Sequence, residues 1–247
     1  CRRKPWYLTR AGVFANPLIR YILRAIHMLP VYRLRDKVDI RMANDPTFDE
    51  CVKLLAGNGS LLIFPEGNHG MQKRLRTPLR KGFARIALTT LSINEGKKEI
   101  YVVPVGLNYE HPTKFRTDVL VRYGKPVAVS PFIAFYQENK PNGLNLLTRK
   151  CEEALSNEMI DIQPLNEYDE IEKKWMETRY LFRDLGVRFN ADKKLIASKE
   201  FISPPGIESP KSIKWILGVL GFPVFMMGLI LNLPLYLVVK GLVRILV

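Results

Sequence analysis

The stretch that decides the fold is Leu61-Leu62-Ile63-Phe64-Pro65-Glu66-Gly67-Asn68-His69-Gly70. Its first four residues form a continuous apolar run, which is typical of a strand buried on both faces of a sheet. A proline and two glycines follow, and they predict a rigid loop at the carboxyl end of that strand. Because ligands bind at the carboxyl ends of strands in open α/β sheets, this loop is the first candidate for a functional site.

Apolar runs continue on both sides of this stretch. The segments Tyr101 to Leu107 and Val119 to Tyr123 predict two further strands, and Val31 to Arg35 alternates as a short one. Helical patterns separate these runs, among them Gly82 to Ile93. The alternation predicts an α/β fold with a mixed, largely parallel sheet flanked by helices.

Two capping signals mark helix starts. Asn16-Pro17 predicts a helix that ends at Pro30, and Asp45-Pro46 predicts a helix that runs to about Ala56. In each pair the polar side chain accepts from free backbone N–H groups, and the proline fits the first helical turn.

The second half of the chain changes in composition. We expect an α/β domain over 1–130, a helical extension over 131–202, a linker over 203–214 and a hydrophobic membrane segment over 215–247. No charged residue occurs from Trp215 to Val239, which is long enough to span a bilayer. A broken helix and a helical hairpin both fit this segment, and a helix buried in a soluble core is the alternative.

The chain has 247 residues and a formal net charge of +14. Such a balance implies an anionic partner, either nucleic acid, an anionic membrane or phosphorylated small molecules, unless the charge is only a solvated surface. The three cysteines are far apart, which argues against a zinc site or a disulfide framework and suits a reducing cytosolic face. Cys51 and Cys151 lie in helical patterns and are expected to be packing residues.

Charged residues gather around the central loop. Glu66 can direct a carboxylate into a crevice, and Arg33 and Arg35 follow an earlier strand. The cations that follow the loop are Lys73, Arg74, Arg76, Arg80 and Lys81. Arginine binds phosphate in a bidentate manner, so the pattern favours a phosphorylated substrate. The simpler alternatives are an ordinary Pro-Glu-Gly turn and a solvated basic face.

Three segments resemble motifs of the lysophospholipid and glycerol-phosphate acyltransferases. Phe64-Pro65-Glu66-Gly67 resembles the third motif of that family, Val103-Pro104-Val105 the fourth, and Pro30-Val31-Tyr32-Arg33 the second. They occur in the family's order, and the resemblance covers about half the chain, from Lys4 to Tyr123.

The resemblance implies an enzyme of phospholipid synthesis. It would move a fatty acyl group from a thioester, on coenzyme A or acyl carrier protein, to the hydroxyl of glycerol 3-phosphate or lysophosphatidic acid, without a metal or bound cofactor. The family commonly has threonine and arginine where Asn68 and His69 stand, so another cation would have to bind the phosphate. The predicted substrate-binding residues are Arg33, Pro65, Glu66, Gly67, Asn68, His69, Arg74, Arg76 and Lys81.

The family's catalytic pair is a His-x4-Asp motif, whose histidine acts as general base on the acceptor hydroxyl. No histidine of this chain has an aspartate five positions later, because Tyr32, Arg74 and Arg116 stand there. The motif precedes the second motif in the family, so we expect it upstream of Cys1, and no catalytic residue is identified within the chain.

Two other functions remain open at this point. One is a catalytically inactive, membrane-bound lipid-binding protein on the same fold. The other is nucleic-acid binding, which only the charge suggests and which the apolar tail and the lack of a recognition motif disfavour. We therefore predict an anionic membrane partner, no nucleic acid, and a membrane location with the α/β domain on the cytoplasmic side.

Overall fold

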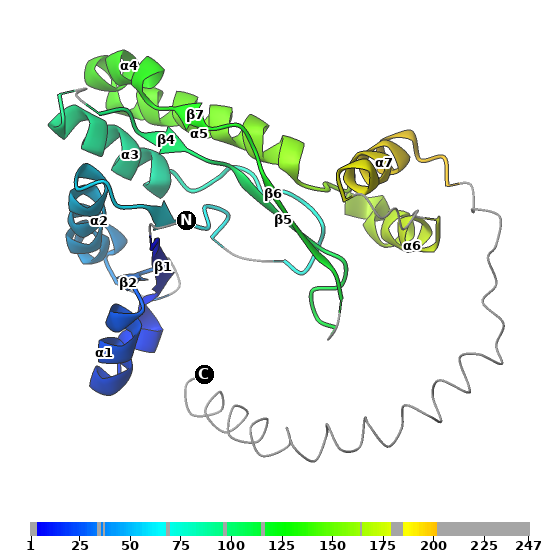
Figure 1. Ribbon diagram of the computed structural model, residues 1–247, viewed down its shortest axis with the longest axis horizontal. Coiled ribbons are helices and arrows are strands. Elements are labelled where there is room, and N and C mark those ends of the chain that lie inside the picture. The colour runs from blue at the N-terminus through cyan, green and yellow to red at the C-terminus, as the bar shows by residue number, and fades with distance from the viewer. Residues whose placement is uncertain are drawn as a thin grey trace. The chain divides into compact units, whose positions relative to one another are not determined.

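The computed structural model describes residues 4–33, 36, 38–67, 70–95, 98–114, 117–163, 165–178 and 185–201 (Figure 1). The described residues all belong to one compact unit, Cys1–Phe201. The fold below is that of this unit. The predicted linker and membrane segment, over 203–214 and 215–247, lie outside the described residues.

A three-stranded parallel sheet contains the first strand of the chain at its centre. β1 (Trp6–Arg10) pairs with β2 (Met28–Val31) on one side and with β3 (Leu61–Leu62) on the other. The register places Arg10 opposite Val31 and Tyr7 opposite Leu62. Because all three strands run in the same direction, the segments after β2 and β3 leave the sheet at one edge.

The remaining strands form two antiparallel pairs. β4 (Tyr101–Val102) pairs with β7 (Val127–Ala128), and β5 (Val105–Tyr109) pairs with β6 (Val119–Tyr123). The sheet structure is therefore mixed, and only its first part is parallel. The single strand expected over Tyr101 to Leu107 is wrong, because Pro104 has no N–H to donate to a ladder and separates β4 from β5.

The bounds of the first three α-helices agree in part with those predicted from the sequence. α1 (Pro17–Ala25) begins as predicted, since Asn16 Oδ1 accepts from the N–H of Leu18 at 2.9 Å. It ends before Pro30, which lies in β2. α2 (Ile40–Ala56) starts earlier than Asp45-Pro46 predicts, with Pro46 inside the helix. A short 3-10 turn, Ala11–Phe14, precedes α1, and α3 spans Gly82–Ile93.

The chain from 130 to 201 is mostly helical. Its elements are the 3-10 turns Ser130–Phe132 and Leu165–Glu167, and the helices α4 (Ile133–Glu138), α5 (Lys140–Glu158), α6 (Tyr168–Thr178) and α7 (Leu185–Ser198). α4 packs on α5, and α6 packs on α7. Gly143 permits the first of these contacts, because a Cβ there would lie 2.5 Å from Cα of Tyr136.

Three groups of buried apolar side chains hold these elements together. The first joins α3, α4 and α5, the second joins α6 and α7, and the third lies between the parallel sheet and helices α2 and α3. Cys51 and Cys151 are buried in the third and the first, which confirms that they are packing residues, and burial raises the pKa of both thiols to about 12.

The central apolar run is less buried than predicted. Leu61, Leu62 and Ile63 are partly buried, and Phe64 is exposed, because β3 is an outer strand of the sheet. In the described ranges, no helix combines the length and apolar character required to cross a bilayer.

Candidate functional site

The loop after β3 is a tight turn held by the backbone. The N–H of Gly67 donates to the carbonyl of Phe64 at 3.3 Å, and the N–H of Arg80 donates to the carbonyl of Pro65 at 2.8 Å. Gly67 has a φ of +72°, in the left-handed region that favours glycine. A Cβ at Gly67 would also lie 3.3 Å from Nε of Arg80, so the turn and the basic segment are in close contact.

Glu66 fixes the basic segment to the loop. Its Oε2 atom accepts from the backbone N–H of Arg76 at 3.1 Å. Burial raises the pKa of Glu66 above its ordinary value of 4.5, and the amide and guanidinium of Arg76 offset part of that rise. The carboxylate is therefore already engaged by protein groups and acts first as an anchor for Arg76.

Three more side chains bind the backbone of the same segment. Tyr168 Oη accepts from Lys73 N–H at 2.7 Å, Asp161 Oδ1 from Leu75 N–H at 3.2 Å, and Glu152 Oε1 from Leu79 N–H at 2.6 Å. Charged acceptors make strong hydrogen bonds to backbone donors. The segment from 73 to 79 is therefore ordered by two carboxylates and a tyrosine hydroxyl far away in the sequence, none of which the sequence analysis identified.

Arg74 and Arg76 differ from the other cations of the segment. Nε of Arg74 is buried and has no hydrogen-bond partner within the described ranges. The guanidinium of Arg76 lies against Gly70, where a Cβ would be 1.5 Å from Nη2. A buried donor without a partner normally bonds to water or a ligand, and the planar guanidinium group suits an oxyanion.

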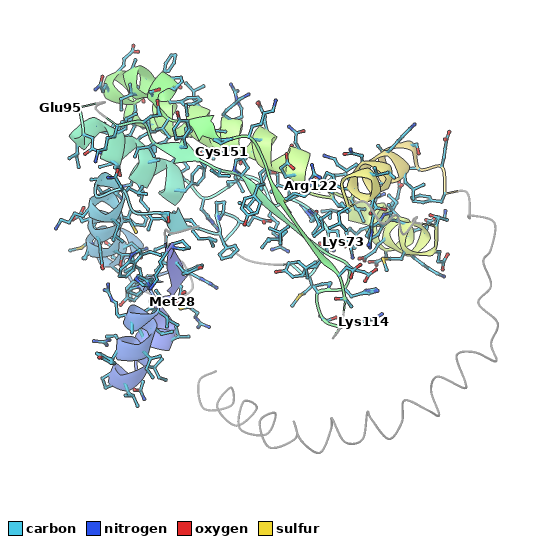
Figure 2. The ribbon with its side chains drawn as sticks, in the orientation of Figure 1. Met28, Lys73, Glu95, Lys114, Arg122 and Cys151 are labelled. Atoms are coloured by element: carbon cyan, nitrogen blue, oxygen red, sulfur yellow. The ribbon has the colours of Figure 1, made fainter. Side chains whose placement is uncertain are left out.

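The side chain of Lys73 pairs with a residue of α6, although Lys73 belongs to the same run of cations as Arg74 and Arg76 (Figure 2). Its Nζ pairs with Glu172 and lies 5.3 Å from the ring centroid of Trp175, and its side chain is only 7% exposed. Lys81 is exposed and immediately precedes α3. Lys73, Arg74 and Lys81 therefore have different surroundings in the structure, although the sequence alone does not distinguish them.

Arg33 leaves the sheet at the same edge as the loop. It follows β2, and its N–H donates to Oδ2 of Asp36 at 2.7 Å. The preceding residue, Tyr32, is held by Asn44, which accepts from its N–H at 2.8 Å and donates to its carbonyl at 3.0 Å. Asn44 is buried, so α2 positions the chain that carries Arg33.

The structure brings most of the predicted residues into one neighbourhood. Contacts link Pro65, Glu66 and Gly67 to the segment that contains Arg74, Arg76 and Lys81. Arg33 follows β2 at the same edge of the sheet, because β2 and β3 both run parallel to β1. Asn68 and His69 lie outside the described residues. No group of three metal-ligating side chains forms among the residues that the structure does describe.

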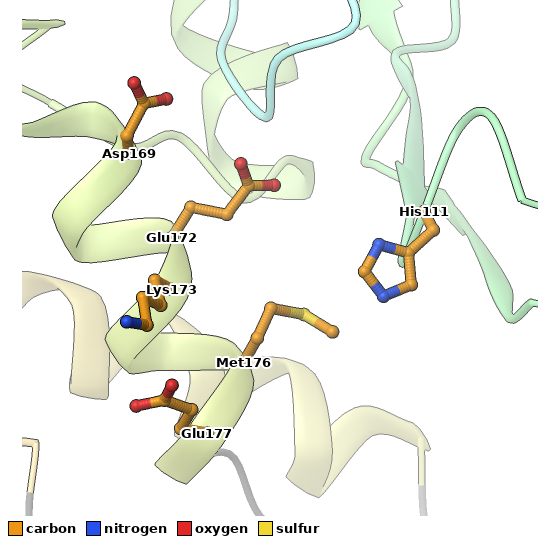
Figure 3. A pocket seen from close by; sticks show the side chains of 6 residues that line it. All are labelled: His111, Asp169, Glu172, Lys173, Met176 and Glu177. Carbon is orange, nitrogen blue, oxygen red and sulfur yellow. The ribbon is translucent and has the colours of Figure 1, made fainter.

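A pocket of about 350 Å³ lies elsewhere, beside α6 (Figure 3). Its lining residues are His111, Asp169, Glu172, Lys173, Met176 and Glu177. Figure 3 shows His111 facing α6 across the opening. Three carboxylates against one lysine make this pocket unsuited to a phosphate, so we do not place the acceptor there.

Comparison with known proteins agrees with the motifs. The acyltransferase family model matches residues 2–108. Glycerol-3-phosphate O-acyltransferase 2 of Saccharomyces cerevisiae is 30% identical over 125 residues, which cover 50% of this chain and 16% of that protein. Glycerol-3-phosphate O-acyltransferase 1 of the same yeast is 32% identical over 112 residues, 45% of this chain and 14% of that protein. No solved structure matches the chain significantly.

The chain thus spans less than a fifth of the length of these relatives. The matched region includes the parallel sheet, the Pro65–Gly67 turn and the Arg74–Arg76 segment. The helices α4 to α7 lie beyond it.

Proposed function

We propose that the protein transfers a fatty acyl group to glycerol 3-phosphate or lysophosphatidic acid, because residues 2–108 match the acyltransferase family model and are similar to two glycerol-3-phosphate O-acyltransferases. The donor is a thioester of coenzyme A or acyl carrier protein. The acceptor oxygen forms a C–O bond with the acyl carbonyl carbon, the C–S bond breaks, and the hydroxyl proton ends on the released thiol.

The observation that carries the acceptor assignment is the buried Nε of Arg74, which has no partner in the described structure. Burying a guanidinium donor without a partner costs free energy, so a ligand oxygen at this place stabilises the protein as well as the complex. Arg76 supplies a second guanidinium next to the Pro65–Gly67 turn. A phosphate monoester has the charge and the several oxygens that such a pair accepts.

Glu66 has a positioning role in this proposal. Its bond to the Arg76 amide fixes the basic segment, and Gly67 lets the turn approach Arg80 closely. The proposed general base is a histidine of a His-x4-Asp pair, which none of the chain's three histidines forms. Described residues therefore bind and orient the acceptor, and none is assigned the proton transfer.

The test is acyl transfer by the natural protein from a radiolabelled acyl-coenzyme A. We expect Arg74→Ala to raise KM for glycerol 3-phosphate about 10- to 100-fold, because a charge-assisted contact is lost. Arg74→Lys, which keeps the charge but not the planar fork, should recover part of the loss. An unchanged KM in Arg74→Ala would remove Arg74 from the acceptor site.

A second candidate is a lipid-binding protein without activity. None of the three histidines of the chain has an aspartate five positions later, and a protein without such a pair would bind the acceptor without transferring an acyl group. Under this alternative, the natural protein would bind lysophosphatidic acid with a dependence on Arg74 but would show no turnover with any thioester donor.

The proposed location is a membrane, with the α/β domain on the cytoplasmic side and 215–247 as the anchor. The support is the uncharged run from Trp215 to Val239 together with the basic net charge. Extraction of the natural protein from membranes by alkaline carbonate would contradict an integral anchor.

A further inference from the structure

α1 is a formed helix whose outer side is apolar and uncovered within the described structure. Exposed fractions are 67% for Leu18, 76% for Tyr21, and 50% for both Ile22 and Ile26. At helical spacing these positions fall on one continuous arc. The other apolar positions, Ile19 and Leu23, are partly buried, on the side where α1 contacts β2 and the preceding 3-10 turn.

The helix does not depend on a ligand for its formation. Asn16 caps its first turn by accepting from the N–H groups of Leu18 and Ile19, and Pro17 occupies the first helical position. Arg20 Nε donates to the carbonyl of Phe14 at 3.1 Å, which ties the helix to the 3-10 turn. The apolar arc is therefore presented in advance, and binding to it has no helix-folding cost.

The sequence segment that contains α1 has charges of one sign. The sequence from Cys1 to Arg35 contains eight arginines and lysines and no aspartate or glutamate. On α1 itself, at about 100° per residue, Arg24 lies roughly 60° from Tyr21 at the border of the apolar arc and pairs with Glu50 of α2 at 2.5 Å, whereas Arg20 lies on the opposite side of the helix. A helix with an apolar arc and arginines on its other sides is typical of helices that lie in the interface of an anionic bilayer.

We propose that α1 is an interfacial membrane helix, which inserts Leu18, Tyr21, Ile22 and Ile26 among anionic lipid headgroups. A tyrosine suits this depth because its ring is apolar and its hydroxyl reaches water. This surface is distinct from the acceptor site and does not rest on the proposed acyl transfer.

Charge argues against the two rival occupants. A second copy would place its own basic residues 1–35 against the same basic region. The residues 202–247 contain four lysines and arginines and one glutamate, so they would also bring positive charge to it. Anionic lipid complements the region, and each cation near such a surface contributes additively to attraction.

The experiment must report on α1 alone, since 215–247, the proposed anchor, would also hold the chain on vesicles. In the full chain with Cys1→Ser, Ile22→Cys carries an environment-sensitive fluorophore. The matched control is Ile93→Cys, at the end of α3, where the isoleucine is 63% exposed. Cys51 and Cys151 are buried and are not expected to label.

With vesicles of phosphatidylcholine and phosphatidylserine, we expect the label at 22 to shift to the blue and to be quenched by nitroxide-bearing lipid. The label at 93 should stay in water. Phosphatidylcholine alone or high salt should weaken the response at 22 about tenfold. Adding Leu18→Asp should weaken it by a similar factor, because an apolar contact is replaced by a repelled charge.

Three outcomes would overturn the proposal. Equal responses at 22 and 93 would mean general adsorption. A label at 22 that is already shielded before lipid is added, in a dimer by sedimentation, would assign the arc to a second copy. The same shielding in a monomer would assign it to another part of this chain. Acyl transfer to soluble glycerol 3-phosphate is measured separately and can persist in each case.

Discussion

Buried cations differ in their ion-pair and hydrogen-bond partners between two regions of the molecule. In the region formed by α6 and α7, Lys73 pairs with Glu172, and Arg188 pairs with Asp118 at 2.9 Å and Glu110 at 3.7 Å. In the basic segment that follows the Pro65–Gly67 turn, Nε of Arg74 is buried without a described partner. Because an unpaired buried donor is costly, the first arrangement indicates a structural role, and the second is the one proposed to bind the acceptor.

The same contrast extends to the aromatic residues. Trp175 donates its Nε1–H to Asp192 at 3.0 Å, and Arg122 lies 4.0 Å from the ring centroid of Phe189 while it bonds to Glu158. In the α6–α7 region the buried charged side chains of Lys73, Arg188 and Asp192 thus each have a described hydrogen bond or ion pair. Four changes test whether this region is structural and the turn is functional.

The largest effect is expected for Trp175→Ala. The side chain is almost fully buried, packs under Lys73 and bonds to Asp192, so its loss creates a cavity and leaves Asp192 without that donor. We expect the free energy of unfolding to fall by about 4 kcal/mol in urea titrations followed by circular dichroism. Trp175→Phe should cost clearly less, and a loss below about 1 kcal/mol for Trp175→Ala would contradict the structural role.

Arg188→Ala and Arg74→Ala form a matched pair. Arg188 is buried and neutralises two carboxylates, so its removal should lower the free energy of unfolding by about 2 kcal/mol. Arg74→Ala removes a donor that has no described partner, and the change should stay within about 0.5 kcal/mol. Thermal and urea unfolding of both variants measure this difference. Equal losses in the free energy of unfolding would show that Arg74 is as important for stability as Arg188.

A pH effect should come from Asp192. Burial raises its pKa to about 6 from 3.8, while the Trp175 N–H and Arg188 act to lower it and Glu110 to raise it. A carboxyl whose folded pKa is raised stabilises the fold below its unfolded pKa, and that contribution is lost as the pH rises through the folded value. Stability should therefore fall by about 1 kcal/mol between pH 4 and 6, after allowance for solvent screening.

The control for that effect is Asp192→Asn, which removes the titrating group but keeps an acceptor for Trp175. Its unfolding curve should depend less on pH over the same interval. An unchanged slope would assign the effect to another carboxyl.

The smallest effect is expected for Glu66→Gln. The amide oxygen can still accept from Arg76 N–H, so the free energy of unfolding should change by less than about 0.5 kcal/mol near neutral pH. Glu66→Ala, which cannot accept, should lose about 1 kcal/mol. Urea titration compares the two, and similar losses would show that the Glu66–Arg76 bond does not hold the segment.

Local signals predicted the elements that local chemistry controls. The Asn16 cap and Pro17 predicted the start of α1, because both act within one turn. The same rule failed at Asp45-Pro46, since Asn44 and Thr47 bond to the backbone around β2 and stabilise a helix that began at Ile40. The antiparallel pairing of β5 and β6 was also missed, although the short connection between them leaves no room for a crossover helix.

The candidate site shows the same limit. The turn at Gly67 and its position after a strand were visible in the sequence. The difference between Lys73 and Arg74 was not, because it depends on Glu172 and Tyr168, about a hundred residues away in the chain. Residue type and spacing identify the cations, and only their tertiary partners show which of them remain available.

The central place of β1 in its sheet has a consequence during synthesis. β1 is made before both of its neighbours, and about fifty residues separate it from β3. At translation rates of roughly 5–20 residues per second, about 3–10 s pass between the synthesis of β1 and that of β3, its second neighbour. Over this interval its unpaired N–H and C=O groups can pair with other nascent chains, so the yield of soluble protein should depend on growth temperature and chaperone supply more than the final stability suggests.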